Sequence, residues 1–133
     1  MIEIKPGKIK DTTVSVPGSK SYTHRMLIAA ALSDGKCVID NVLQSEDTLL
    51  TLACLKQMGV KVEEEEDKLT IFHCDKLNGA EINHENDHRI AMACSIAALF
   101  AISSSHISNI GIVKDSYPNF VDDLETLGVN IEK

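Results

Sequence analysis

The chain has 133 residues, of which 44% are hydrophobic and 25% charged, with a formal net charge of −7 at pH 7. This length and composition predict one globular domain and exclude a disordered or fibrous protein. The negative charge argues against nucleic acid or an anionic membrane as a partner, because both require clustered positive charge.

The first half of the chain is predicted to alternate short strands with helices. Strands are expected at 2–5 and 11–16, where apolar and polar residues alternate. After a Pro17-Gly18 turn, apolar residues recur with helical period and predict a helix over about 20–33, with Gly35 as its stop. The next predicted elements are a strand at 37–42, a helix at about 46–58 capped by Ser45-Glu46-Asp47, and strands at 60–64 and 68–72 joined by an acidic hairpin turn.

The second half repeats this order after a stretch of weak pattern at 75–84. Asn86-Asp87 is typical of a helix cap and precedes a predicted helix over about 88–101. The remaining predicted elements are a strand at 105–112, a turn at 116–118, a helix at about 119–127 and a strand at 129–132. The expected fold class is therefore α/β.

An internal repeat organises these elements. His24-Arg25 and His88-Arg89 are each read as lying on the first turn of a helix that continues with small apolar residues, and the segment 55–63 is echoed by 124–132. Each unit reads β-α-β-α-β-β, over about 14–72 and 82–133. The second unit lacks its closing strand unless the strand at 2–5 supplies it, so we expect the two ends of this single domain to pair.

The strongest chemical motif is Pro17-Gly18-Ser19-Lys20-Ser21 followed by Arg25. A helix that begins after a Pro-Gly turn directs free backbone N–H groups outward, and its N-terminus favours negative charge. Lys20 and Arg25 add positive charge, and serine hydroxyls add hydrogen bonds. The motif predicts a phosphate or carboxylate site. An ordinary serine-capped helix with exposed basic residues explains the same pattern.

A second group of polar residues combines Arg89 with Lys114 and the following Ser116-Tyr117-Pro118. If the repeat is real, Arg25 and Arg89 begin related helices, and their positive charges converge on one face. The alternative is a surface ion pair between Arg89 and a nearby carboxylate, which contributes only about 0–1 kcal/mol.

The segment His84-Glu85-Asn86-Asp87-His88 formally matches the zinc-protease motif H-E-x-x-H. Here the expected helix start falls inside the motif, so the two histidines should not share a helix face. No third ligand is obvious, although His106 is available. We therefore interpret the match as fortuitous.

The four cysteines form no C-x-x-C pair, and three lie in apolar stretches, which favours buried thiols in a reducing compartment. The N-terminus lacks the residue order of a signal peptide, and no apolar run reaches the roughly 18 residues of a membrane-spanning helix. The sequence therefore predicts a soluble cytoplasmic protein.

The motifs together resemble those of the 5-enolpyruvylshikimate-3-phosphate synthase family. Pro17–Arg25 and Ser45-Glu46-Asp47 resemble the N-terminal part of these enzymes, and 76–82, 86–92 and 116–120 resemble the C-terminal part. Family members are much longer, so the chain looks like two separated segments joined with the middle absent. The join should fall near 55–70, where the two segments are themselves alike.

This resemblance implies transfer of the enolpyruvyl group of phosphoenolpyruvate to shikimate 3-phosphate, on the route to aromatic amino acids, without a metal or organic cofactor. It implies that Lys20, Ser21 and Arg25 bind shikimate 3-phosphate and that Arg89 binds phosphoenolpyruvate. The family also places a lysine directly before its Ser/Thr-aromatic-Pro sequence. Asp115 stands there in this chain, and Lys114 comes one residue earlier.

The sequence also lacks family segments from the middle of the enzyme: a Gly-Asn-Ala-Gly-Thr loop, a Ser-Ser-Gln phosphate contact and an acidic pair for proton transfer. Enolpyruvyl transfer requires such acid–base groups, so turnover is expected to fail. Three hypotheses stay open: an enzyme, active alone or through self-association over the surfaces left by the missing segments; a non-catalytic module that binds small anions; and a folded fragment without function.

Overall fold

The structure is a computed structural model that describes residues 13–15, 19–42 and 44–132. Its first unit has the predicted β-α-β-α-β-β order. The elements are β1 (Thr13–Ser15), α1 (Lys20–Ala31), β2 (Lys36–Asp40), α2 (Glu46–Gln57), β3 (Val62–Glu64) and β4 (Lys68–Phe72). The predicted strand at 2–5, and with it the expected pairing of the two chain ends, lies outside the described residues.

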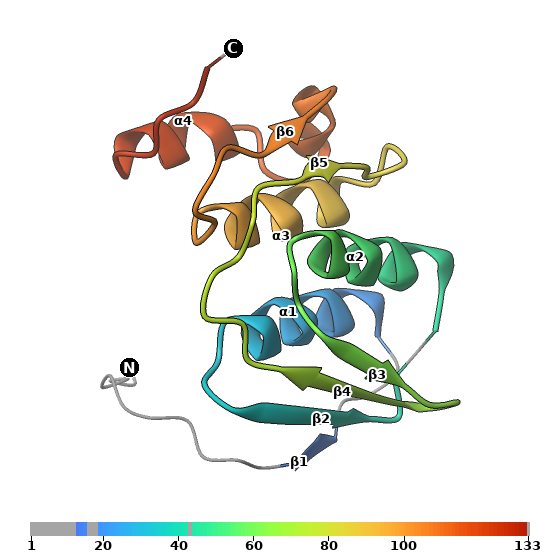
Figure 1. The fold of residues 1–133 in the computed structure, drawn as a ribbon. Coiled ribbons are helices and arrows are strands. Elements are labelled where there is room, and N and C mark those ends of the chain that lie inside the picture. The colour runs from blue at the N-terminus through green and yellow to red at the C-terminus, as the bar shows by residue number, and fades with distance from the viewer. Residues whose placement is uncertain (1–12, 16–18, 43, 133) are drawn as a thin grey trace, which may run out of the picture.

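The four strands of this unit form one sheet in the order β1-β2-β4-β3. β1 runs parallel to β2, whereas β4 is antiparallel to both of its neighbours. β3 and β4 form the predicted hairpin around the acidic turn. Ile39 pairs with Leu69 in the register of β2 and β4, and both side chains are buried with Ile71. The sheet thus presents an apolar surface, and α1 packs beside it (Figure 1).

The second unit is less regular than the sequence predicts. Its elements are β5 (Glu81–Ile82), α3 (His88–Ala98), β6 (His106–Ile107), the 3-10 helix η1 (Ile110–Asp115) and α4 (Phe120–Thr126). β5 and β6 form a parallel pair. The prediction of a strand over 105–112 is wrong beyond Ile107, because the chain turns at Asn109, whose φ is 49°, and continues as η1.

The predicted final strand at 129–132 does not form. A strand needs a neighbour for its backbone N–H and C=O groups, and no described strand is hydrogen-bonded to this segment. Val129 and Ile131 instead pack as partly buried residues against a small second core, which is built from Ala91, Val113, Phe120 and Leu124. Within the described residues, the second unit is therefore the predicted repeat without its strand at 129–132.

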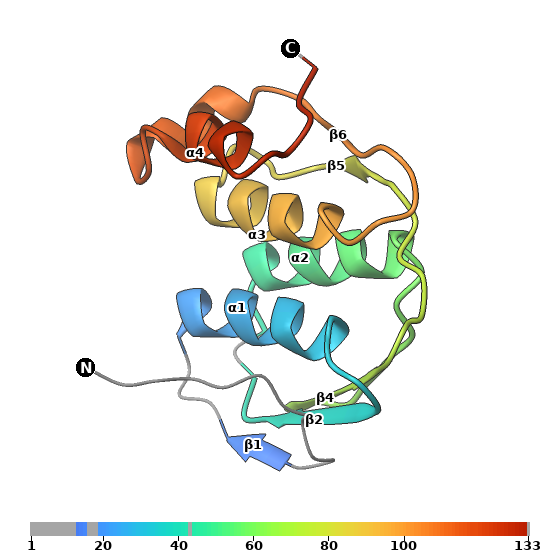
Figure 2. The same cartoon turned by 90° about the vertical axis from the view of Figure 1, so that its left-hand side faces the viewer.

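Three helices lie in the middle of the molecule and contact one another in every pairing. Figures 1 and 2 show α1, α2 and α3 running in the same direction, with their N-termini on one side. Leu27, Leu55 and Ile90 are fully buried between the helices, and each contributes about 1.5–3 kcal/mol by leaving water. Among the described helices, none is long and apolar enough to cross a membrane.

The echoed segments at the ends of α2 and α4 adopt the same helix stop. Gly59 and Gly128 have left-handed φ values of 98° and 91°. Val60 and Val129, which follow them, each donate a backbone hydrogen bond of 3.0 Å to the carbonyl of the leucine five residues earlier. Only glycine adopts this conformation without steric cost, so the repeated Leu-x-x-x-Gly-Val pattern produces the same local structure twice.

Candidate functional site

The first turns of α1 carry three of the predicted site residues. Lys20 is exposed and Ser21 is partly buried, whereas Arg25 lies one turn further along the helix, with its guanidinium 6.0 Å from the ring centre of Tyr22. The N-cap residue is Ser19, whose backbone is extended and whose side chain makes no capping hydrogen bond. The capping hydrogen bond of an ordinary serine cap is therefore not made by Ser19, although Lys20 and Arg25 are exposed as that alternative expects.

The neighbouring helices α2 and α3 begin on the same side of the molecule (Figure 2), and the side chains of their N-cap residues do make capping hydrogen bonds. Ser45 and Thr48 form a capping box at the start of α2. The Asp87 carboxylate accepts hydrogen bonds from the backbone N–H groups of Arg89 at 2.7 Å and Ile90 at 3.4 Å, which confirms the predicted cap of α3. Of these three N-cap side chains, only that of Ser19 makes no capping bond in the described part of the chain.

The expectation that Arg25 and Arg89 occupy equivalent helix positions is wrong. α1 begins at Lys20, which places Arg25 in its second turn, whereas Arg89 is the second residue of α3. The first helix thus begins five residues before Arg25, whereas α3 begins one residue before Arg89. Arg89 Nη1 lies 3.8 Å from Asp87 Oδ2 with both side chains partly exposed, a weak ion pair.

A buried histidine links α1 to α2. The His24 ring is 2% exposed, and its Nδ1 lies 2.8 Å from Thr51 Oγ1 on α2. Its Nε2 has no hydrogen-bond partner among the described residues. Burial lowers the pKa of His24, and the charged groups that modify this effect come from all three helices: Asp87, Asp47, Arg89 and Lys20. Lys20 and Arg89 thus disfavour a charged imidazole at this position, whereas Asp87 and Asp47 favour it.

Asp47 is one of the charged groups that interact with His24, and the sequence indicated it only as part of a helix cap. Its Oδ2 lies 2.6 Å from Lys20 Nζ, and the hydrogen bond from Lys20 lowers the pKa of the Asp47 carboxyl. The only sign of Asp47 in the sequence was its position in the first turn of the helix predicted at about 46–58. The order of residues alone did not indicate that Asp47 pairs with Lys20.

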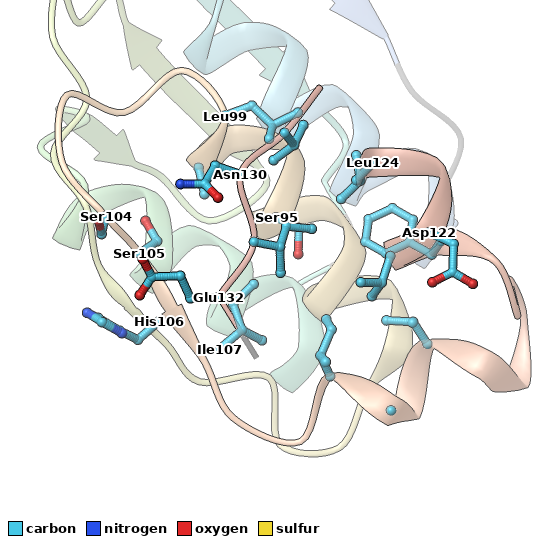
Figure 3. A pocket seen from close by; sticks show the side chains of 18 of the residues that line it. Ser95, Leu99, Ser104, Ser105, His106, Ile107, Asp122, Leu124, Asn130 and Glu132 are labelled. Atoms are coloured by element: carbon cyan, nitrogen blue, oxygen red, sulfur yellow. The ribbon is translucent and has the colours of Figure 1, made fainter. Parts of the chain in front are cut away.

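The fifth predicted site residue is Lys114. It belongs to η1 and lines an open hollow of about 1230 Å³ between α3 and the C-terminal segment, and none of the other four residues lines this hollow. Figure 3 shows Ser95, Leu99 and Ile107 facing it, with Asp122 and Glu132 at its border. Carboxylates disfavour an anion, so the hollow does not extend the cluster at the helix ends.

The two histidines of the zinc-like motif are placed apart, as the predicted helix start requires. His84 is buried before the helix, and its Nε2 donates to the Ser108 carbonyl at 2.7 Å, whereas His88 is the first residue of α3. Between them Glu85 and Asn86 have left-handed φ values of 45° and 59°. The described residues include no group of three or more His, Cys, Asp or Glu side chains arranged to hold a metal ion.

Comparison with known proteins identifies the family. The family model EPSP synthase (3-phosphoshikimate 1-carboxyvinyltransferase) matches twice, at residues 4–68 and 53–124. The overlap of the two matches, 53–68, falls where the sequence predicted the join. The chain is 47% identical over 64 residues to the chloroplastic 3-phosphoshikimate 1-carboxyvinyltransferase of Petunia hybrida, an alignment covering 48% of this chain and 12% of that enzyme. It is 42% identical over 62 residues to the Neisseria meningitidis enzyme, covering 47% and 14%.

Solved structures give the same result. The EPSP synthase of Acinetobacter baumannii superposes with a TM-score of 0.72 at 30% identity, covering 84% of this chain and 27% of that one. The enolpyruvyl transferase NikO of Streptomyces tendae superposes with a TM-score of 0.73 at 16% identity, which shows the fold alone; that match covers 94% of this chain and 29% of NikO. The chain spans less than a third of any of these relatives. It belongs to the EPSP synthase family and corresponds to a part of such an enzyme.

Proposed function

We propose that this partial EPSP synthase retains a half-site for shikimate 3-phosphate at the N-terminal end of α1 and binds this anion without completing enolpyruvyl transfer. The observation that carries the proposal is the N-terminal turn of α1, which has no side-chain cap from Ser19 and bears Lys20 and Ser21. The relatives are named for 3-phosphoshikimate, which supplies the class of ligand.

The chemistry of this turn suits a phosphate group. Backbone N–H groups at a helix start favour an anion by about 0.3–1 kcal/mol at an exposed site. Lys20 supplies a mobile positive charge, Ser21 a hydroxyl donor and Arg25 a planar fork of donors. The Lys20 side chain is 45% exposed, so a ligand from solution can reach it.

Arg89 supports a second part of the same proposal. It stands at the start of α3, its ion pair with Asp87 is loose, and its charge reaches the environment of His24. We propose that Arg89 binds the acidic group of phosphoenolpyruvate. Lys114 lines the hollow beside α3, and we do not include it in the proposed half-site.

Turnover is not expected from the chain by itself. Family segments that supply proton transfer are missing from its sequence, and each curated match covers only 12–14% of the relative. A metal or organic cofactor is not part of the proposed chemistry. Self-association to rebuild a fuller cleft, and a cytoplasmic location, both stay predictions.

The test is an amide NMR titration with shikimate 3-phosphate, with inorganic phosphate as the reference anion. Wild type should show saturable shifts at residues 19–25 that exceed those caused by phosphate. Lys20→Ala should lose these shifts. Lys56→Ala is the matched control, because Lys56 is also exposed and paired with a carboxylate, Glu64, but lies in the last turn of α2 at the other end of the helices.

The outcomes separate the three hypotheses. Loss of binding in Lys20→Ala but not in Lys56→Ala establishes the half-site. Shifts that are equal for both ligands, or that survive in Lys20→Ala, contradict it and leave a folded fragment. Release of phosphate from phosphoenolpyruvate in the presence of shikimate 3-phosphate is the assay for turnover, and we expect none above the uncatalysed rate.

A further inference from the structure

The cation at the centre of the proposed half-site already has an internal partner. Lys20 Nζ donates to Asp47 Oδ2 at 2.6 Å, a contact between residues 27 positions apart, on the first turns of α1 and α2. The Asp47 side chain is 24% exposed, about half the exposure of Lys20. The Lys20 side chain is therefore open to solvent, whereas the Asp47 carboxylate is partly enclosed by the protein.

The fold stabilises Asp47 as a charged carboxylate at this position. Asp47 stands in the first turn of α2, where the helix N-terminus favours negative charge, and the hydrogen bond from Lys20 lowers the pKa of its carboxyl. The capping box of Ser45 and Thr48 fixes the same turn. The oxygens of this carboxylate offer Lys20 the same kind of charged acceptor that a phosphate offers.

We propose that Asp47 is a built-in competitor for the ligand: its carboxylate holds the Lys20 ammonium, and an anion binds this end of α1 only by drawing Lys20 away from it. This inference rests on the proposed half-site. Breaking the Lys20–Asp47 contact costs the same free energy whichever anion binds, so the competition weakens the binding of phosphates and carboxylates by the same factor.

Glu46 provides a matched control on the same helix turn. It is exposed, carries the same charge and stands directly beside Asp47, but the contact of Lys20 is with Asp47. Asp47→Asn and Glu46→Gln therefore remove the same charge from the first turn of α2, and only the first removes the partner of Lys20. A general electrostatic effect acts in both variants, whereas competition for Lys20 acts in one.

The experiment measures binding of inorganic phosphate and of acetate by NMR at pH 7.5. Asp47→Asn should bind phosphate up to about fivefold more tightly, because an exposed ion pair is worth up to about 1 kcal/mol. Acetate should gain by a similar factor in the same variant, because the Lys20–Asp47 contact must be broken for either anion. Glu46→Gln should change both affinities less. The increase should vanish when Asp47→Asn is combined with Lys20→Ala.

A second measurement, without ligand, separates this inference from the proposed function. The Asp47 carboxyl should titrate below the ordinary range of aspartate in wild type and move upward in Lys20→Ala. Titration in the ordinary range in wild type overturns the inference whether or not anions bind. Phosphate binding that depends on Lys20, but is no tighter in Asp47→Asn than in Glu46→Gln, overturns the inference alone. Absence of binding in wild type and Asp47→Asn overturns the half-site and the competition together.

Discussion

The Nδ1 atom of His24 lies 2.8 Å from the hydroxyl oxygen of Thr51, which joins α1 to α2 through a histidine ring that is only 2% exposed. The other ring nitrogen has no hydrogen-bond partner in the described structure. A neutral imidazole can make the hydrogen bond with Thr51 without bringing a charge into the core. A protonated ring would place a charge among the cores of three packed helices, so the fold favours the neutral form.

This arrangement predicts a loss of stability on mild acidification. Burial lowers the pKa of His24 below its ordinary value of 6.5, so the unfolded chain binds a proton at a higher pH than the folded chain does. The contribution of neutral His24 is fully present above pH 6.5 and is lost as pH falls from there to the lower folded pKa. Urea unfolding at pH 7.5 and 5.5 should show a smaller fall in free energy for His24→Gln than for wild type.

His73→Gln is the control for this pH dependence. The pKa of His73 is raised, mainly by its hydrogen bond to the Ser33 carbonyl. Its contribution is therefore present below pH 6.5 and is lost as pH rises through the raised folded pKa, which is the opposite sign. An acid loss that is the same in wild type and in His24→Gln would contradict the assignment of that loss to His24.

The caps of α1 and α2 predict unequal effects of the same substitution. Ser45→Ala should cost about 1 kcal/mol of unfolding free energy, because it removes the side-chain acceptor of a capping box. Ser19→Ala should cost less than about 0.5 kcal/mol, because its side chain makes no such bond. Thermal and urea unfolding of the two variants measure the difference. Equal costs would show that Ser19 caps α1 in solution.

The four free thiols should divide into a fast and a slow pair when titrated with a disulfide reagent. Cys37 and Cys74 are partly exposed, whereas Cys54 and Cys94 are buried between α2 and α3. The hydrogen bond with Cys54, together with burial, raises the pKa of the Cys94 thiol, and only the thiolate is the nucleophile. All four should react quickly in urea. Four fast thiols in the native protein would show that the contact between α2 and α3 opens easily.

The C-terminal helix should be the least protected of the described helices. α4 has seven residues, and its small core depends on Phe120 and Leu124. Helices this short are not stable by themselves, so its amides should exchange with deuterium faster than those of α2. Phe120→Ala should abolish protection in α4 and leave α2 nearly unchanged. Leu55→Ala, in the main core, should lower protection everywhere, at a cost of about 2–5 kcal/mol. Equal protection of α2 and α4 in wild type would contradict this view.

The elements of the first unit follow from local sequence. The apolar period of α1 and α2, and the left-handed glycine stops at Gly35 and Gly59, predicted both helices to within two residues of their observed ends. The Asn86-Asp87 cap predicted the start of α3 in the same way. Local chemistry suffices here because a helix satisfies its own backbone groups, and its caps and stops act within a few residues. The motif around Lys20 and Arg89 was likewise sufficient to indicate the family.

Tertiary structure decided the features that depend on contact between distant residues. The segment 129–132 has the pattern of a strand, but a strand forms only where a neighbour accepts its hydrogen bonds. The place of Lys114 in the lining of the hollow, and the pairing of Lys20 with Asp47, depend on how η1 and α2 pack against the other helices. A sequence specifies which residues carry charge. Which charges meet is set by the packing of the core, because Coulomb energies depend on distance in space and on burial.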